Sequence, residues 1–312
     1  MDTVFSPTEP YPPTLMNFEQ MFPTEESCRH YLEQIRWPDG FVCPDCSSKQ
    51  AWVRSRGLWT CGGCGLETSL TSRTIFEGTR KPLRLWFRVM WMLTGPKDGV
   101  SAQDLQRQLG FSRYETVWTW LHKLRRAMVR PRRDRLSGQV EVDETYVGGV
   151  ERGVKGRQTL TKSIVAIAAE KRGRYIGRIR LQHVPDVTTE NLYPFVLNSI
   201  VPGSTIHTDA WPAYQCLQEK GYKHKVSNIS QSDRLAHELL PRVHRIASLL
   251  KRWILGTHHG SIDPGHLQYY LDEFTFRFNR RASSSRGKLF HKLLEQAVEL
   301  HGVSRERIVQ KI

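Results

Sequence analysis

Apolar residues in the first part of the chain recur at three- and four-residue intervals. Residues 1–23 carry five prolines, which predicts an extended or mobile arm. The apolar spacing from Cys28 to Ile35 then predicts a short helix capped by Thr24. Cys28 is therefore expected in a core rather than at a ligand position, and Cys216 is interpreted in the same way.

The segment from Leu83 to Met128 has helical periodicity throughout. Its first helix is interrupted near Gly95, and a second one begins at Ser101, which has Asp104 three residues later as in a capping box. That helix ends at Gly110, and another begins a few residues further on. Two helices joined by a short glycine-containing turn fit helix-turn-helix geometry, although any helical hairpin gives the same pattern.

Beyond Gly138 the pattern changes to alternating strands and helices. Strands are predicted over residues 140–147, 163–169, 174–184, 204–208 and 222–226. Helices are predicted over residues 189–200, 211–220, 240–255, 266–281 and 288–300. Antiparallel strands followed by a βαβα pattern predict a mixed sheet flanked by helices, so the fold class is α/β within a multidomain α+β chain.

Composition narrows the class of protein. Hydrophobic residues make up 39% and charged residues 25% of the 312 residues, which excludes wholesale disorder. The formal net charge of +15 indicates a polyanionic partner such as DNA, with an unspecific basic surface as the alternative. No apolar run is long enough to cross a membrane, and no secretory signal is evident. We expect a cytoplasmic protein with reduced cysteines.

Four cysteines form two CxxC pairs separated by 14 residues, at positions Cys43, Cys46, Cys61 and Cys64. The interval between the pairs predicts two strands joined by a turn at residues 55–57. Four thiolates at this spacing predict a closed, structural Zn²⁺ site in a small ribbon. Two disulfides or a redox motif are the alternatives, disfavoured by the compartment and by the lack of a βαβ context.

A basic run follows the predicted helix-turn-helix. The residues of this run that we expect to contact DNA phosphates are Lys123, Arg125, Arg126, Arg130, Arg132 and Arg133. A solvated helix face is the alternative interpretation. A second basic segment, residues 150–161, is predicted to be an exposed loop between strands.

Two aspartates lie on predicted strands of the mixed sheet. Asp143 is inside an apolar strand, and Asp209 ends another strand just before a helix, where a capping role is the alternative. On the helix that starts at Pro241, His244 and Lys251 share the face opposite the apolar stripe. Both side chains are therefore expected to face one cleft beside the aspartates.

The chain resembles the DDE-type transposases of bacterial insertion sequences, specifically those that join an N-terminal zinc ribbon to an RNase H-like catalytic domain. The motifs that carry the resemblance are the two CxxC pairs, Val142-Asp-Glu-Thr-Tyr-Val-Gly-Gly149, Thr208-Asp-Ala-Trp-Pro-Ala-Tyr214 and His244-Arg-Ile-Ala-Ser-Leu-Leu-Lys-Arg-Trp253. The resemblance implies a ribbon region over residues 24–75, a helix-turn-helix-like segment over 80–135, a catalytic domain over 138–300 and a tail over 301–312.

The resemblance also implies the roles of the site residues. Asp143 and Asp209 take the two aspartate positions, and Lys251 takes the basic position that contacts a phosphate. His244 stands where many relatives have glutamate; it is expected to bind metal or to shuttle a proton, and Glu273 is the alternative third acidic residue. Glu273 could equally pair with Arg277 on its own helix.

The activity that the resemblance implies is cleavage at the ends of a mobile element and joining of the freed 3′ ends to target DNA. Two Mg²⁺ ions, or Mn²⁺ in their place, would serve this chemistry. The partners are then the terminal inverted repeats and target DNA, with a homo-oligomer assembled on them. A DNA-binding protein without catalytic activity and an RNase H-like nuclease are the alternatives.

Overall fold

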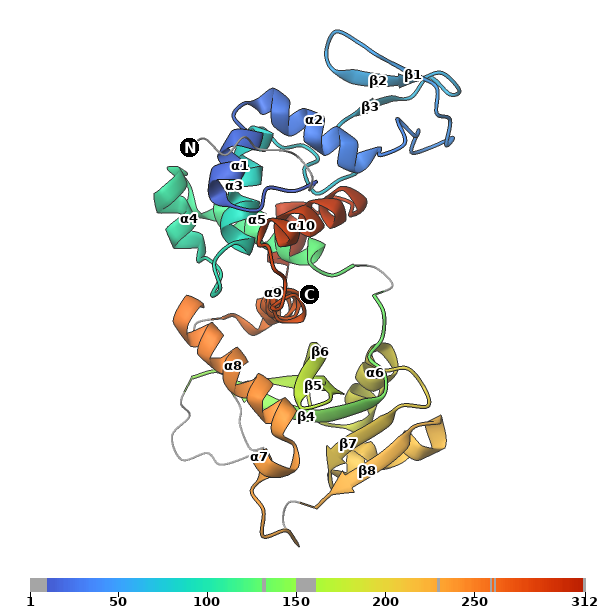
Figure 1. Cartoon of the computed structure of the whole chain (residues 1–312), viewed down its shortest axis with the longest axis vertical. Helices are drawn as coiled ribbons and strands as arrows, with labels where there is room; N and C mark the ends of the chain where they lie inside the picture. Colours follow the sequence, from blue (N-terminus) through green and yellow to red (C-terminus); the bar gives the residue numbers. More distant parts are fainter. Residues whose placement is uncertain are drawn as a thin grey trace. The chain divides into compact units, whose positions relative to one another are not determined.

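The computed structural model describes residues 10–130, 133–149, 161–228, 231–258, 260 and 262–310. The chain divides into two compact units (Figure 1), each described by itself below. The first unit comprises Met1–Arg130 together with Ala282–Gln310, and the second comprises Pro131–Arg281. The predicted catalytic domain over 138–300 therefore extends too far, since residues 282–300 belong to the first unit.

The first unit consists of short helices and a small sheet. Its helices are α1 (Leu15–Met21), α2 (Glu25–Arg36), α3 (Leu83–Thr94), α4 (Ala102–Leu109), α5 (Tyr114–Ala127), α10 (Gly287–Glu299) and α11 (Arg305–Val309). Its strands β1 (Ala51–Val53), β2 (Leu58–Cys61) and β3 (Glu67–Ser69) form an antiparallel sheet in that order. The turn at residues 55–57 joins β1 to β2, as the sequence predicts.

An aromatic cluster explains why α10 belongs to this unit. The ring of Phe290 on α10 lies 5.5 Å from that of Phe18 and 5.6 Å from that of Phe87, in edge-to-face geometry. The predicted extended arm is wrong at residues 15–21, because Thr14 caps α1 there and Phe18 is buried in this cluster. Residues 1–9 of that arm lie outside the described residues.

Two capping interactions fix the start of the helical region. Thr24 and Ser27 form a reciprocal capping box at the start of α2, and Cys28 is fully buried, as predicted. The carboxylate of Glu25 accepts hydrogen bonds from the backbone N–H groups of Leu83 and Arg84, at 2.8 and 3.0 Å. Glu25 thereby caps α3, whose own N-cap residue is a proline.

The second unit is built on a five-stranded mixed sheet. Its strands are β4 (Gln139–Val147), β5 (Ser163–Arg172), β6 (Tyr175–Val184), β7 (Thr205–Asp209) and β8 (Lys223–Ser227), in the spatial order β6-β5-β4-β7-β8. β4, β5 and β6 pair antiparallel, whereas β7 pairs parallel with both β4 and β8. The predicted mixed sheet flanked by helices is confirmed.

Helices cover both faces of this sheet. The helical segments are α6 (Thr189–Ser199), η2 (Pro212–Lys220), α7 (Ala236–Leu239), α8 (Pro241–His258), η4 (Pro264–His266) and α9 (Leu267–Asn279). α6 and η2 pack on one face around Tyr214, and α8 and α9 pack on the other around Ile167. η2 is a 3-10 helix rather than the predicted α-helix, with Pro212 at its first position.

α9 also protects the β6 edge of the sheet. The side chain of Asn279 accepts from Ile179 N–H and donates to the Ile179 carbonyl, and Gln268 accepts from His183 N–H. These contacts occupy part of the backbone hydrogen-bonding edge of β6 and so disfavour its pairing with another chain. None of the described helices is both long enough and apolar enough to span a lipid bilayer.

Candidate active site and zinc centre

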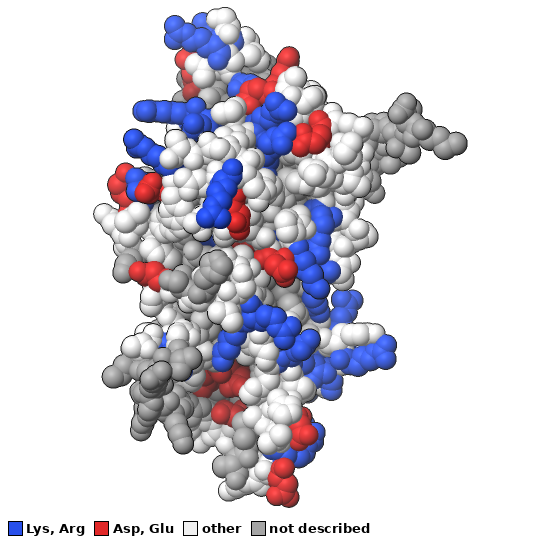
Figure 2. Space-filling model, turned by 90° about the vertical axis from the view of Figure 1, so that its left-hand side faces the viewer, with Lys and Arg blue, Asp and Glu red and all other residues white. Residues whose placement is uncertain are grey.

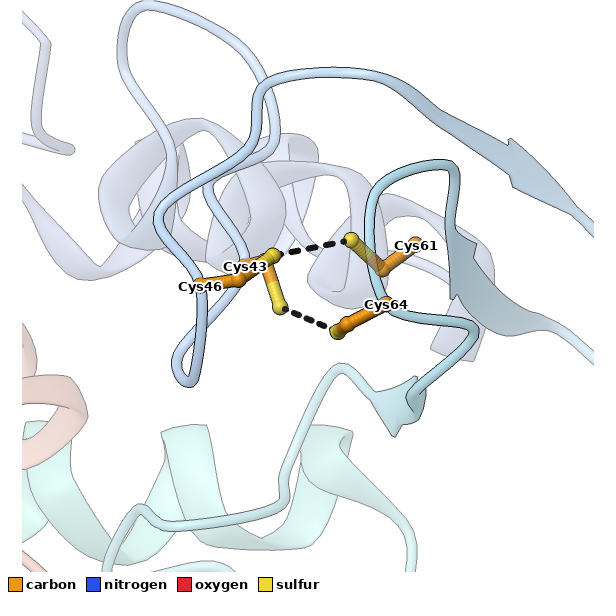
Figure 3. A group of neighbouring side chains, drawn as sticks. All are labelled: Cys43, Cys46, Cys61 and Cys64. Atoms are coloured by element: carbon orange, nitrogen blue, oxygen red, sulfur yellow. Dashed lines mark hydrogen bonds between the residues drawn. The ribbon is translucent and has the colours of Figure 1, made fainter.

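Four cysteine thiols converge between two knuckles of the ribbon (Figure 3). The Sγ atoms of Cys43 and Cys64 are 3.6 Å apart, those of Cys46 and Cys61 are 3.4 Å apart, and all four lie within 4.8 Å of one another. A tetrahedral metal ion bound by four sulfurs requires Sγ atoms at about this separation. The predicted grouping of the four cysteines is confirmed.

The backbone around the knuckles favours a thiolate. Hydrogen bonds from the backbone N–H groups of Cys64 and Gly63 lower the pKa of the Cys61 thiol to about 6. The backbone carbonyl of Gln50 accepts from Gly62 N–H, which ties the second knuckle to β1. These donors fit a metal ligand, which must be deprotonated to bind.

The two aspartates lie on neighbouring parallel strands. The β4–β7 register pairs Gln139 with Thr205 and Glu141 with His207. The same register, carried two residues further, sets Asp143 level with Asp209 and on the same face of the sheet. Asp209 also accepts a hydrogen bond from Trp211 N–H at 3.0 Å, but Trp211 is itself the N-cap residue of η2, which has no side-chain cap. The capping role considered for Asp209 is therefore not the one it has.

His244 reaches Asp143 from α8. Its Nε2 atom lies 3.6 Å from the Asp143 carboxylate, is buried, and makes no hydrogen bond within the described residues. The pKa of His244 is lowered, first by burial and then by the charge of His237, although Glu141 acts in the opposite direction. The structure therefore brings together two of the predicted site residues, with a neutral imidazole facing a carboxylate.

The described residues contain no second group of three ligand-type side chains that gathers as closely as the four cysteines. Asp143, Asp209 and His244 thus share one face of the sheet without converging on one point. Their donor types, two carboxylates and an imidazole with an unsatisfied buried nitrogen, fit a divalent cation.

Glu141 positions α8 against the sheet. Its buried carboxylate accepts from the backbone N–H groups of Arg242 and Val243, at 2.6 and 3.1 Å, in the first turn of α8. The Arg242 guanidinium pairs with the same carboxylate at 2.7 Å. Glu141 lies two residues before Asp143 on β4. By binding the first turn of α8, it fixes the helix that carries His244 next to Asp143. Sequence reasoning missed it, although Glu141 has the same strand-face parity as Asp143.

A buried tyrosine lies beneath the aspartates. The hydroxyl of Tyr214, which is 1% exposed, donates to the Glu144 carboxylate at 3.1 Å. Burial raises the pKa of Tyr214, and the charges of Glu144, Asp143 and Asp209 add to that rise. Tyr214 therefore stays protonated, and it links η2 to the strand that carries Asp143.

Two lysines approach each other at the exposed side of α8. Lys251 is exposed, and its pKa is lowered by burial of part of the side chain and then by the charge of Lys162. Lys162 immediately precedes β5 and was not singled out by the sequence. Two like charges held close together form a site for an anion such as a phosphate.

Glu273, the alternative third acidic residue, is engaged elsewhere. It is fully buried, and its carboxylate pairs with Arg277 at 3.0 Å on the same helix. The structure thus favours the alternative interpretation given for it, an i, i+4 ion pair.

The basic run does not form one DNA-facing surface. Arg125 is only 1% exposed because the second half of α5 is enclosed within the first unit, so the prediction that it contacts DNA is wrong. Lys123 and Arg126 are partly buried and Arg130 is exposed. Arg133 is partly buried, and its pKa is lowered by burial while the charge of Asp272 acts against that. Arg132 and residues 150–160 of the predicted basic loop lie outside the described residues.

The helix-turn-helix candidate instead exposes its turn and the start of α5. Gly110 ends α4 with a left-handed φ of 66°, a conformation that favours glycine. Ser112, Arg113, Tyr114 and Glu115 are all exposed. In helix-turn-helix proteins these are the positions that reach base edges.

Comparison with known proteins assigns the chain to a class. An ISXO2-like transposase domain matches residues 135–279, and a transposase zinc-ribbon domain matches residues 23–67. A protein of the transposable element ISH50 from Halobacterium salinarum, described as uncharacterized, is 26% identical over 281 residues. That alignment covers 82% of this chain and 91% of the relative.

The mixed sheet, the four-cysteine ribbon and these matches support an insertion-sequence transposase. The chain is similar to proteins of this class in both parts, a zinc ribbon and an ISXO2-like transposase domain. The transposase match ends at the last residue of α9, close to the end of the second unit at Arg281.

Proposed function

We propose that the protein cleaves DNA at the ends of its own mobile element and joins the freed 3′ ends to target DNA, using a DDE-type site in an RNase H-like domain. The observation that carries the proposal is the unsatisfied, buried Nε2 atom of His244 facing Asp143, on the sheet face that also holds Asp209. A buried polar atom without a partner is costly, and a bound cation would satisfy it.

Asp143, Asp209 and His244 are the residues that would hold the catalytic metal, Mg²⁺ or Mn²⁺. When bound, the metal supplies activation of the attacking oxygen and stabilisation of the leaving one. The side chain of His244 is neutral at pH 7, so it offers a lone pair rather than a repelling charge. Glu141 binds the helix that carries His244, and Tyr214 binds the strand that carries Asp143. Residues that hydrogen-bond around the ligands of a metal site commonly orient those ligands in this way.

Lys251 and Lys162 are proposed to hold a phosphate next to the scissile bond. The two cations repel each other, and this repulsion is relieved when an anion binds between them. Positioning of the phosphate in line with the attacking hydroxyl is the main contribution that the protein's own residues make to such a displacement.

The four cysteines are proposed to bind one structural Zn²⁺. With four protein ligands the site is closed, so the ion would stabilise the ribbon and take no part in the chemistry. The ribbon and the exposed start of α5 are proposed to bind the terminal inverted repeats, with Arg113 and Tyr114 at the bases. Lysine and arginine side chains are spread over the face shown in Figure 2, which favours a DNA partner.

Cleavage of DNA that carries the element's own ends tests the proposal. With Mg²⁺, the wild-type chain should release 3′ ends, and Asp143→Asn and Asp209→Asn should each lower the rate by about 100-fold or more. Asp39→Asn, an exposed aspartate of the first unit, is the matched control and should cleave normally. Normal cleavage by Asp143→Asn would contradict the assignment of the site.

The role of His244 has its own test. His244→Glu should retain metal-dependent cleavage, because a carboxylate can replace the imidazole as a ligand, whereas His244→Ala should lose it. If the wild type binds element ends without cutting them and His244→Glu cuts, the protein is a DNA-binding member of the family instead. Cleavage without joining of 3′ ends would indicate the alternative function, an RNase H-like nuclease.

A further inference from the structure

One face of β7 and β8 carries a row of polar side chains that ends at Asp209. The parallel register pairs residues of β7 with residues of β8, and paired residues point to the same face. Glu141 pairs with His207 and contacts α8, so this is the face on which α8 lies. We call this row the β7–β8 lane; its residues are Thr205, His207, Asp209, Lys223, Lys225 and Ser227.

Within the described residues, no helix packs over the lane. The apolar core beneath α8 and α9 takes its strand residues from β4, β5 and β6, and none from β7 or β8. Figure 1 shows α8 beside β4 and clear of β7 and β8. Lys223 and Lys225 are exposed, and Thr205, His207 and Ser227 are partly exposed. On the opposite face, Ile206 and Thr208 of β7 are fully buried, whereas Val226 of β8 is exposed.

The lane carries two positive charges beside the candidate active site. Within the part of the chain that the structure describes, the side chains of Lys223 and Lys225 make no hydrogen bond or ion pair. His207 Nε2 lies 2.7 Å from Ser227 Oγ, and the pKa of His207 is lowered by burial and then by the charge of Lys225. His207 is therefore neutral at pH 7 and adds a polar group rather than a charge.

Spacing and residue types fit a DNA backbone. Residues two apart on a strand are separated by about 6.6 Å, and one DNA strand carries a charge about every 3.4 Å along the helix axis. Lys223 and Lys225 are thus far enough apart to contact two different phosphates of one strand. Lysine, serine and threonine side chains commonly contact phosphates, and the lane contains no arginine, asparagine or glutamine, so we expect contacts to the backbone.

We propose that the β7–β8 lane binds the phosphate backbone of the target DNA duplex and leads it to the carboxylates. This inference rests on the proposed function. A transposase must bind its own ends by sequence and its target largely without regard to sequence. The lane has the chemistry of the second task and ends at Asp209, and it belongs to the second unit, whereas the ribbon and the helix-turn-helix candidate belong to the first.

The test separates joining from cleavage. Lys223→Gln/Lys225→Gln should lower the joining of pre-cleaved element ends to a target plasmid by about tenfold, while cleavage of the element ends stays within about twofold of wild type. Binding of the full chain to plain duplex DNA should lose about two units of its log–log salt dependence, since each phosphate contact contributes about 0.9. Lys223→Arg/Lys225→Arg should restore both.

Lys171→Gln/Arg172→Gln is the matched control. These exposed cations lie at the end of β5, which β4 separates from the lane in the sheet order. The control should join ends normally. The inference is overturned if the lane variant joins ends as well as wild type and its binding to plain duplex DNA has an unchanged salt dependence. It is also overturned if cleavage and joining fall together, because the lane would then bind the element ends. If the wild type cleaves nothing, the proposed function fails, and the salt dependence alone decides whether the lane binds DNA.

Discussion

Burial sets the protonation states of individual residues in the second unit. His244, His207 and His183 all have pKa values lowered mainly by burial, so each is neutral at pH 7. For His244 this matters most, because a protonated imidazole would be repelled by a bound cation. The same desolvation acts on carboxyl groups in the opposite direction.

Asp272 on α9 provides a test of this effect. Burial raises its pKa to about 6, although a hydrogen bond from Gln268 and the charge of Arg133 act to lower it. Between about pH 4 and pH 6 the Asp272 carboxyl keeps its proton in the folded state and loses it in the unfolded state. The free energy of unfolding therefore falls as the pH rises through this range. Asp272→Asn should remove about 1–2 kcal/mol of this pH dependence from the free energy of unfolding, after allowance for partial solvent exposure.

Urea unfolding at pH 4.5 and at pH 6.5 gives the free energy of unfolding of wild type and of Asp272→Asn at each pH. Hydrogen exchange of the α9 amides monitors the unfolding. Asp186→Asn is the control with the opposite sign. Hydrogen bonds from Thr188 and Asn191 lower the pKa of Asp186, so its contribution is present at neutral pH and is lost as pH falls. An equal pH dependence in wild type and Asp272→Asn would contradict the assigned shift.

At the scale of elements, one carboxylate ties the first turn of α8 to the sheet. Glu141→Ala would leave two N–H groups of the first turn and the Arg242 guanidinium without their acceptor. We expect a loss of about 3 kcal/mol in the free energy of unfolding of the second unit. Because α8 carries His244, cleavage should fall as well.

Glu238→Ala is the control for this prediction, because its pairing with Arg234 is exposed and 3.9 Å long, and the one hydrogen bond it accepts, from Leu235 N–H, is exposed as well. It should cost no more than about 1 kcal/mol. Chemical denaturation followed by circular dichroism measures both variants. Equal stability of Glu141→Ala and wild type would contradict the role of Glu141 as a cap.

The stability of the ribbon is expected to depend mainly on its zinc ion. Its own core is thin: the rings of Phe41 and Trp59 stack at 5.4 Å, while Trp52 and Val53 remain exposed. Chelation of zinc, or Cys43→Ser, should therefore increase hydrogen exchange over residues 40–66 and leave the five-stranded sheet unchanged. Retention of one zinc ion per chain by Cys43→Ser would argue against the four-cysteine site. Cys28→Ser, which replaces a buried cysteine outside the ribbon, should keep its zinc.

At the scale of the whole molecule, the two units are interleaved in sequence. The chain leaves the first unit at Arg130, builds the second, and returns at Ala282 to complete the first. α10 contributes Phe290 to the aromatic cluster, and the carbonyl of Ala297 accepts from Ile75 N–H. The first unit is therefore incomplete until the last part of the chain is present.

A chain that ends at Arg281 tests this division. It should lose hydrogen-exchange protection in α2, α3 and α5 and lose specific binding to element ends, because the apolar surface against α10 becomes exposed. The second unit should keep its protection and its thermal transition. Protection that falls in β4–β7 rather than in α3 would instead support a catalytic domain that extends to residue 300.

Local chemistry determined much of this protein by sequence alone. The CxxC spacing predicted the four-cysteine group. The run of apolar and β-branched residues predicted the strand that contains Asp143, and helical spacing predicted that His244 and Lys251 share one face of a helix. These features depend on residues close in sequence, whose geometry the backbone dictates. The helix at residues 15–21 was missed because it depends on burying Phe18 against residues far along the chain.

Only the tertiary structure decided which groups are buried and what they contact. The basic run has the same composition whether or not it is solvated, yet α5 is enclosed and Arg125 is removed from solvent. Glu141 reads as one more strand residue until α8 supplies donors from 101 positions later. Likewise, nothing in the periodicity of α10 states which unit buries its apolar face. Long-range packing selects among partners that short-range patterns leave equivalent, and for that reason the candidate site residues followed from the sequence while their surroundings did not.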